Sequence, residues 1–352
     1  MSNKRYPMRR LASICVPSPA TCAAMVTVLL GITVSLSAAA AETVGGRNAM
    51  QWLALMDHAL TELNYDGVFS YVHGNEVSSL RVVHGMLDGE LRERLIHLDG
   101  APREIIRHGD QVACILAPGD KLLDLEDSIP SGPFARAFTR YSGELPKSYR
   151  LRLGRMGRFA TRDAVELVID PIDGDRFGYR LWADTETGLL LRSEMMDADG
   201  ERLETFQFVT VEIGEPIARE DLDPAPGPGL ILHHLTLDEE IASPRRGGAL
   251  WTVDWLPEGF SMAAWDIRRI PSSLKSVNTL MYNDGLAAFS VFIEDMPATG
   301  GTDQVSRRGG TVAVAHPLDV PEDHPRLVTV VGEIPTGTAK RIAASVKRTV
   351  PR

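Results

Sequence analysis

The candidate metal ligands of this sequence are two adjacent histidines, His233 and His234, followed by Asp238, Glu239 and Glu240. Imidazole and carboxylate groups together can hold zinc and similar ions. Side chains of adjacent residues on an extended chain point in opposite directions, so these two histidines converge poorly on one ion. We therefore interpret the segment as a solvated linker and predict neither a metal nor a cofactor.

Catalytic motifs are missing from the chain. It has no Gly-x-Ser-x-Gly, no phosphate loop, no Gly-x-Gly-x-x-Gly, no His-Glu-x-x-His and no Cys-x-x-Cys. Its many carboxylates include no pair that stands out for acid-base work. Cys114 lies in an apolar run, which favours an inert core position over a reactive one. A hydrolase would need a nucleophile with a base, so we predict a protein that is not an enzyme.

Arginines are frequent in the first predicted strands, although the formal net charge of the chain is −10. An acidic chain repels a phosphate backbone, so we predict no nucleic-acid partner. Two interpretations stay open: the hydrated face of a sheet, or a basic rim for phosphate or carboxylate groups. The arginines are Arg81, Arg92, Arg94, Arg103, Arg107, Arg150, Arg152, Arg155 and Arg158.

Several predicted strands are apolar on both faces, for example around Phe69 and Tyr71 and over 189–191. A sheet covered on one face only would alternate apolar and polar residues. A curled sheet with a helix inside it or across its mouth explains the pattern. An apolar cavity that takes a lipid chain explains it equally well.

The first 41 residues have the layout of a signal peptide. Lys4, Arg5, Arg9 and Arg10 form a positive start, and an uncharged apolar stretch then ends in the small residues 37–41. We expect cleavage after Ala41, which removes those four positive charges and makes the mature chain more acidic. An uncleaved anchor is the alternative, since the apolar stretch is almost long enough to span a bilayer. No second stretch of this kind follows, so we expect a soluble mature chain.

The remaining residues, 42–352, are enough for about two domains. Apolar residues three and four apart predict a helix over 50–64. Short strands separated by turn pairs such as Asp88-Gly89 then indicate a large antiparallel sheet, curled or closing as a barrel. We assign 42–215 to this domain, with a short helix expected at 133–141. The predicted strands are 68–73, 80–83, 91–98, 104–108, 112–117, 164–170, 177–183, 189–196 and 203–213.

A composition change after residue 215 marks a linker. Segment 223–229 is rich in proline and glycine, so we assign 216–248 to the linker and expect it to let the domains move. A smaller domain follows over 249–352. Its predicted strands are 286–293, 311–315 and 327–332, and a helix begins near Pro335 and Thr336.

Several runs resemble the MucB/RseB family of periplasmic regulators, in the right order and over nearly the whole mature chain. They are Leu-Asn-Tyr-Asp-Gly-Val-Phe-Ser-Tyr at 63–71, Asp-Thr-Glu-Thr-Gly-Leu-Leu-Leu-Arg at 184–192, Trp-Leu-Pro-Glu-Gly-Phe at 255–260, Tyr-Asn-Asp-Gly-Leu at 282–286 and Val-Thr-Val-Val-Gly-Glu-Ile-Pro at 328–335. The sequence departs from the family at Asn283, where serine is usual, and in the proline- and acid-rich stretch 316–325.

The resemblance implies an α+β protein: a large half-open antiparallel barrel like the periplasmic lipoprotein carriers, with helices at its mouth, and a smaller mixed α/β domain. It implies a regulator in the periplasm that binds the periplasmic part of a transmembrane anti-sigma factor and protects it from regulated proteolysis. This restrains the envelope-stress sigma factor until lipopolysaccharide or lipoprotein acyl chains release the hold. A homo-oligomer is left open.

Two sets of candidate site residues follow from these expectations. For the large domain we predict a lipid cavity walled by Phe69, Tyr71, Leu80, Val82, Ile106, Leu181, Met195 and Phe206. For the small domain we predict a partner surface made of Tyr282, Asn283, Asp284, Gly285, Phe289 and Phe292, although the Asn-Asp-Gly turn is also what a plain hairpin needs. A lipid or lipoprotein carrier is the alternative function, and the second domain favours the regulator because a carrier has little need of it.

Overall fold

The computed structural model describes most of the chain from residue 43 onward. The described ranges are 43–109, 111–116, 145–222, 231–235, 250–269, 276–296, 301–320 and 324–349. The predicted signal peptide and the helix expected at 133–141 lie outside them. No helix in these ranges is long and apolar enough to cross a membrane.

One eleven-stranded sheet forms the large domain, and its neighbouring strands pair antiparallel. The strand order is β11-β5-β4-β3-β2-β1-β10-β9-β8-β7-β6, so two meanders meet where β1 pairs with β10. The order ends at β11 and β6 without joining them, which leaves the barrel half open, as expected. The strands are β1 (Tyr65–His73), β2 (Glu76–Leu87), β3 (Glu90–His97), β4 (Arg103–His108), β5 (Gln111–Leu116), β6 (Tyr149–Phe159), β7 (Arg162–Pro171), β8 (Gly178–Asp184), β9 (Leu190–Met196), β10 (Arg202–Ile213) and β11 (Ile231–Leu235).

Local sequence explains the tight hairpins and the bends of this sheet. Asp88 and Gly89 have φ of 56° and 80° between β2 and β3, the positive φ at both positions that matches a two-residue hairpin. The register shifts between Val68 and Phe69 and between Leu153 and Met156. Such bulges bend a strand and increase its twist, which lets the sheet curl.

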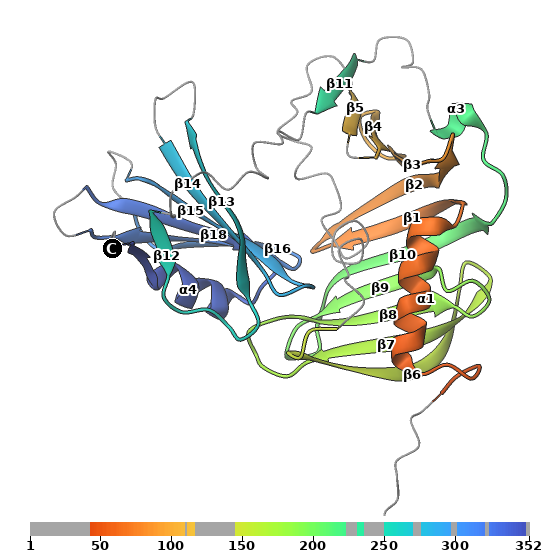
Figure 1. Ribbon diagram of the computed structural model, residues 1–352, viewed down its shortest axis with the longest axis horizontal. Coiled ribbons are helices and arrows are strands. Elements are labelled where there is room, and N and C mark those ends of the chain that lie inside the picture. The colour runs from red at the N-terminus through yellow and green to blue at the C-terminus, as the bar shows by residue number, and fades with distance from the viewer. Residues whose placement is uncertain are drawn as a thin grey trace, which may run out of the picture. The chain divides into compact units, whose positions relative to one another are not determined.

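Helix α1 (Ala49–Glu62) lies across β6 to β10 (Figure 1). A capping box starts it: the Asn48 side chain accepts from the Gln51 N–H, and the Gln51 side chain accepts from the Asn48 N–H. The buried face of the helix packs into the large-domain core and consists of Trp52, Leu53, Met56, Ala59 and Leu60. The predicted helix is therefore confirmed, and it covers the apolar face of half the sheet.

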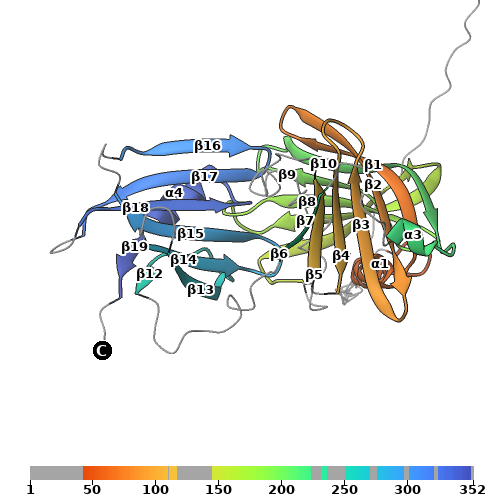
Figure 2. The ribbon, with the colours of Figure 1, turned by 90° about the horizontal axis from the view of Figure 1, so that it is seen from above.

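The small domain is a six-stranded sheet of order β13-β14-β15-β18-β17-β16 with a separate pair, β12 and β19. Helix α4 (Thr336–Ala344) packs against one face through β17 and β18 (Figure 2). The strands are β12 (Trp251–Val253), β13 (Ser261–Arg269), β14 (Ser276–Asn283), β15 (Ala288–Asp295), β16 (Gln304–Arg308), β17 (Thr311–Leu318), β18 (Arg326–Gly332) and β19 (Val346–Arg348).

The fold class predicted from the sequence is confirmed, with more strands than expected. The expected strands 286–293, 311–315 and 327–332 correspond to β15, β17 and β18. Within the range predicted as linker, the structure has a short helix, α3 (Arg219–Leu222), and β11, which pairs with β5 in the large sheet. His233 and His234 therefore belong to a strand, opposite Cys114 and Ala113.

Candidate functional site

Most residues predicted to wall a lipid cavity belong to one buried core in the large domain. Tyr71 packs against its edge. Ile106 is buried as well, but it lies outside this core, because it alternates with Ile105 and faces the other side of β4. The core residues from the predicted set are Phe69, Leu80, Val82, Leu181, Met195 and Phe206.

The aromatic residues of this core pack on one another. The ring centroids of Phe69 and Phe206 are 4.7 Å apart, and those of Phe206 and Phe208 are 5.1 Å apart and nearly perpendicular. Both distances are typical of favourable aromatic pairs. Side chains thus fill the space between α1 and the sheet here, and a ligand entering it has to displace such contacts.

The residues predicted as a partner surface divide between two faces and one turn. Tyr282 and Phe289 stack in the small-domain core, with ring centroids 5.1 Å apart and planes at 15°. Phe292 and Asn283 are half-buried and alternate with core residues, so they lie on the sheet face opposite α4. Gly285 is exposed at the β14–β15 turn, where its φ is 101°.

Asp284, in the same turn, contacts the large domain. Its Oδ2 accepts from Nη1 of Arg176 and, at 3.1 Å, from the hydroxyl of Tyr149. Its Oδ1 accepts from the N–H groups of Leu286 and Ala287 at 2.9 and 2.8 Å. Both side chains of the Arg176–Asp284 ion pair have 0% exposure, so this contact is buried between the two domains.

Arg176 is held by further groups on the β7–β8 loop and around it. Asp173 accepts from its Nε at 3.0 Å and its Nη2 at 2.9 Å, and the Glu258 carbonyl accepts from Nη2 at 2.6 Å. The guanidinium carbon lies 5.4 Å from the ring centroid of Tyr149 and 5.1 Å from that of Phe260. Burial alone would lower the pKa of Arg176, but the hydrogen bonds that Arg176 donates to Asp173 and the charge of Asp284 outweigh it and raise that pKa.

A second contact between the domains involves the β16–β17 turn. The Gly310 N–H donates to Oε1 of the buried Glu204 at 2.9 Å, and the Tyr71 hydroxyl donates to Oε2 at 2.6 Å. His73 Nε2 lies 2.6 Å from the carbonyl oxygen of Arg308. Burial, together with the Glu204 charge, raises the pKa of Tyr71 and keeps it a donor.

Helix α4 supplies a third contact, where the Thr338 hydroxyl donates to Asp175 at 2.8 Å. Specific polar groups thus dock the small domain on the large one.

Sequence reasoning missed Arg176 and Glu204 as functional candidates. Arg176 follows Asp173-Gly174, which has the sequence of an ordinary hairpin turn. No feature of the neighbouring sequence identifies Asp284 as the partner of Arg176.

On the small-domain sheet face opposite α4, two central rows of side chains are nearly free of charge, and charged residues such as Glu294 and Arg308 lie in the rows that flank them. Two rows of side chains cross all six strands, and the one charged member is Asp266 on the edge strand β13. Among these side chains, that of Met281 is 39% exposed. The first row is Ala264, Met281, Ser290, Val331, Ala313 and Ser306; the second is Asp266, Thr279, Phe292, Thr329, Ala315 and Gln304. We call these two rows the uncharged face.

Several of the arginines noted in the sequence form ion pairs with carboxylates of the same sheet, which agrees with the hydrated-face interpretation. A guanidinium that is already paired is less available to a ligand phosphate. The pairs are Arg81–Asp66 at 2.5 Å, Arg94–Glu104 at 2.8 Å, Arg107–Glu93 at 3.9 Å and Arg152–Asp170 at 3.1 Å.

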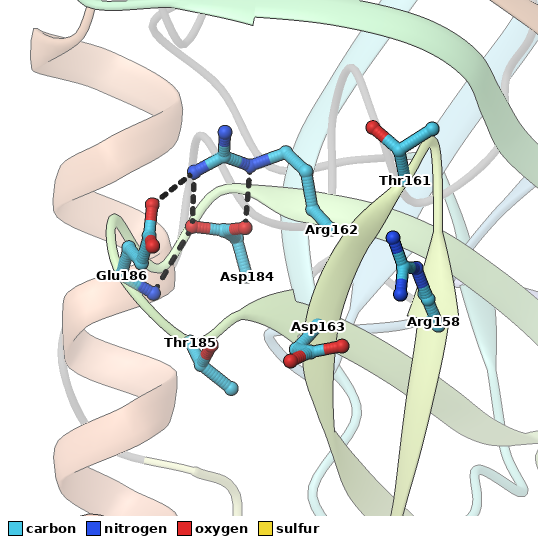
Figure 3. Close-up of a pocket in the computed structure, with 7 residues that line it drawn as sticks. All are labelled: Arg158, Thr161, Arg162, Asp163, Asp184, Thr185 and Glu186. Carbon is cyan, nitrogen blue, oxygen red and sulfur yellow. Dashed lines mark hydrogen bonds and ion pairs between the residues drawn. The ribbon is translucent and has the colours of Figure 1, made fainter.

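A polar pocket lies where the β6–β7 turn meets the β8–β9 turn (Figure 3). Arg162 donates to the buried Asp184 at 2.6 and 3.1 Å, and Asp184 also accepts from the Thr187 N–H at 2.8 Å. Burial alone would raise the pKa of Asp184, but the hydrogen bonds from Arg162 and Thr187 lower it. The group stabilises the turn. The lining residues are Arg158, Thr161, Arg162, Asp163, Asp184, Thr185 and Glu186.

Metal binding has no support in the described part of the chain. No three histidine, cysteine, aspartate or glutamate side chains there come close enough to hold an ion. The sequence candidates Asp238, Glu239 and Glu240 lie outside the described residues.

Comparison with known proteins covers both domains. A family model of the MucB/RseB N-terminal domain matches residues 48–226, and one of the MucB/RseB C-terminal domain matches 245–347. The sigma factor AlgU regulatory protein MucB of Pseudomonas aeruginosa is 33% identical over 305 residues, covering 85% of this chain and 91% of that protein. The sigma-E factor regulatory protein RseB of Escherichia coli (strain K12) is 30% identical over 303 residues, covering 84% and 89%.

Solved structures agree with the fold. The crystal structure of MucB in complex with MucA(peri) has a TM-score of 0.70 and 32% identity, covering 86% of this chain and 100% of that one. The complex of Pseudomonas aeruginosa MucA and MucB has a TM-score of 0.69 and 33% identity, covering 86% and 99%.

Proposed function

Because this chain belongs to the MucB/RseB family, we propose that it is a periplasmic regulator that binds the periplasmic region of a transmembrane anti-sigma factor. Binding protects that region from regulated proteolysis and so restrains the envelope-stress sigma factor, until lipid-type ligands release it. The names of its relatives as sigma factor regulatory proteins support the proposal, as does a solved complex of MucB with MucA(peri).

The observation that carries this proposal in the present chain is the uncharged face of the small domain. Charged residues are depleted at the centres of protein interfaces, where both partners lose water. Two neighbouring rows of side chains, six strands wide and with one charge at the edge, have that composition. Of the residues predicted for partner contact, Phe292 lies within this face and Asn283 at its end, and we assign the contact to them.

We further propose that the chain acts by binding alone. The buried ionisable groups of the site, Arg176, Asp284 and Glu204, are all in hydrogen bonds or ion pairs that hold the domains together. Each has a structural partner, and none is paired as a base with a nucleophile. Purified mature protein is expected to turn over no ester, peptide or glycoside.

Calorimetric titration of the mature chain, 42–352, with the periplasmic segment of the anti-sigma factor from the same organism tests the function. Phe292→Lys and Thr329→Lys each place a charge in the middle of the uncharged face. Burying an unpaired charge in an interface is costly, so each variant is expected to weaken binding at least about tenfold.

The matched control is Val77→Lys, which adds the same charge at a large-domain position that is 65% exposed. It is expected to bind like the wild type. Equal affinity for all four proteins would show that the uncharged face is not the contact surface. Failure of the wild type to bind the segment at all would reject the proposed function.

A lipid or lipoprotein carrier is the second candidate, and the apolar core beneath α1 favours it. A carrier that works through the large domain alone does not need the small domain to dock on Arg176 and Glu204. Strong binding of a fluorescent fatty acid by a chain that ignores the anti-sigma segment would favour the carrier.

A further inference from the structure

Strand β6 is the last strand of the large sheet (Figure 1). Among the residues that the structure describes, it pairs with β7 alone. An edge strand presents backbone N–H and C=O groups on its outer side, and another extended chain can pair with them. This edge of the half-open barrel is therefore a candidate binding surface.

The strand register determines which backbone groups of β6 face the open side. The Ile172 N–H donates to the Ser148 carbonyl at 2.9 Å. In an antiparallel pair every second residue exchanges such bonds, so the even-numbered residues from 148 to 152 direct their backbone groups to β7. The N–H and C=O groups of Leu151 and Leu153 then point away from β7, toward the open edge.

The side chains along this edge are basic, although the formal net charge of the chain is −10. No aspartate or glutamate occurs from residue 145 to residue 162. Arg150 and Arg152 lie on the sheet face opposite the core, because they alternate with Leu151 and Leu153, which pack in the core. The exposed basic residues of the stretch are Lys147, Arg150, Arg152, Arg155 and Arg158.

The carboxylates of β7 offset only part of this charge. Asp170 accepts from Arg152 at 3.1 Å, and the two side chains are 46% and 52% exposed. An ion pair this exposed is weak, so Arg152 can exchange its partner at little cost. Glu166 is buried and accepts from the backbone N–H of Arg155 at 2.8 Å.

The opposite side of the same edge is apolar. Met156 lies opposite Val165, a residue of the large-domain core, so its side chain is on the core side of the sheet. Met156 is nevertheless 55% exposed. An added strand with apolar side chains on this side would cover it, which is favourable because apolar surface leaves water.

A second copy of the chain does not suit this edge. A symmetric pair of copies that continues the sheet sets β6 antiparallel to itself, so an arginine of one copy lies beside an arginine of the other. Like charges directly opposite each other destabilise a strand pair. Carboxylates at the same positions would instead be attracted to Arg150 and Arg152.

We propose that the β6 edge binds an extended, acidic polypeptide segment as an added strand of the large sheet. The backbone of the segment pairs with Leu151 and Leu153. Two carboxylates, two residues apart, lie opposite Arg150 and Arg152, and the apolar residues that alternate with them cover Met156. This surface belongs to the large domain, and its binding is independent of the uncharged face and of the proposed function.

Calorimetric titration of the mature chain, 42–352, with the peptide acetyl-Thr-Val-Glu-Val-Glu-Val-Thr-amide tests the proposal. A version with lysine in place of both glutamates reverses the charge. A version N-methylated at the first two valines keeps the charge but lacks the N–H groups that pair with Leu153 and Leu151. Each change is expected to weaken binding at least about tenfold.

Variants of the protein locate the site. Arg150→Glu is expected to weaken binding of the glutamate peptide at least about tenfold. Lys340→Glu makes the same change in net charge at an exposed position of α4 and is expected to bind like the wild type. Asp170→Asn removes the carboxylate that competes for Arg152 and is expected to tighten binding about threefold.

Hydrogen exchange at the amides of Leu151 and Leu153 reports the strand pairing itself. Both amides are expected to exchange more slowly when the glutamate peptide is bound. Absence of binding by the glutamate peptide would overturn the proposal and leave the arginines as a guard against edge pairing. Equal binding of the N-methylated peptide, equal weakening by Lys340→Glu, or unchanged exchange at saturation would overturn it as well, because each would show attraction by charge alone. The first and last of these tests use the wild-type chain, so they do not depend on the folding of any variant.

Discussion

Alanine at Gly310 is expected to loosen the second contact between the domains. A Cβ at this position would lie 2.3 Å from Sδ of Met195 and 3.0 Å from Oε1 of Glu204. Met195 is 1% exposed and belongs to the large-domain core, so it has little room to move. The β16–β17 turn must shift outward, and the hydrogen bond from the Gly310 N–H to Glu204 is lost.

The size of the effect follows from the two contacts that change. A hydrogen bond to a charged acceptor contributes about 1.5–3 kcal/mol. Forcing an extra carbon into a packed site costs about 1–3 kcal/mol. The outward shift that relieves the crowding is the one that breaks the hydrogen bond, so the two costs are alternatives, and the smaller of them, about 1 kcal/mol, raises the population in which this contact is open by about fivefold.

Hydrogen exchange of the peptide that contains Gly310 measures this opening directly, because the amide exchanges when its bond to Glu204 breaks. Gly337→Ala is the matched control in the same domain. A Cβ at Gly337 meets nothing within 4 Å, and its helical position favours alanine by about 0.5–1 kcal/mol. Exchange at residue 310 is expected to stay at the wild-type rate in this control.

The reasoning would be refuted by a Gly310→Ala variant that exchanges at residue 310 as slowly as the wild type. That result would mean that Met195 and Glu204 move aside at little cost, and that the turn does not depend on the close approach of its backbone. Faster exchange in Gly337→Ala as well would trace the effect to the small domain itself rather than to docking.

Three further predictions concern pH, metals and the core. Asp184→Asn should lower the free energy of unfolding at pH 7 by about 1–3 kcal/mol. The pKa of Asp184 is lowered in the folded chain. The extra free energy of unfolding of the wild type over Asp184→Asn is therefore present above the unfolded pKa of about 3.9 and disappears as the pH falls through the folded pKa. Urea midpoints measured across pH 2–7 would show this loss. Excess EDTA should leave the melting temperature unchanged, and a clear decrease would show that His233 and His234 bind a metal. Leu181→Ala, at 0% exposure, should cost about 2–5 kcal/mol in urea unfolding, whereas a loss below about 1 kcal/mol would indicate that Leu181 lines an open cavity instead of a packed core.

Elements whose signals are local could be predicted from the sequence. The helix predicted over 50–64 corresponds to Ala49–Glu62, because spacing of its apolar residues and the capping box at Asn48 are properties of neighbours along the chain. The β2–β3 turn at Asp88-Gly89 was likewise predicted from its dipeptide. Strand β14 is among those missed, because serine, asparagine and threonine interrupt its apolar residues.

The candidate site shows what local pattern cannot decide. The predicted partner surface includes Asp284, and the structure shows that this carboxylate binds Arg176, 108 residues earlier in the chain. Phe69 and Ile106 had the same apolar signal, but the register of β4 directs Ile106 away from the core. Sequence spacing determined the kinds of element and indicated two domains, and specific residue runs carried the family resemblance. Only the tertiary structure decided which carboxylate meets which arginine, because burial and pairing depend on surfaces that come together after the strands have formed.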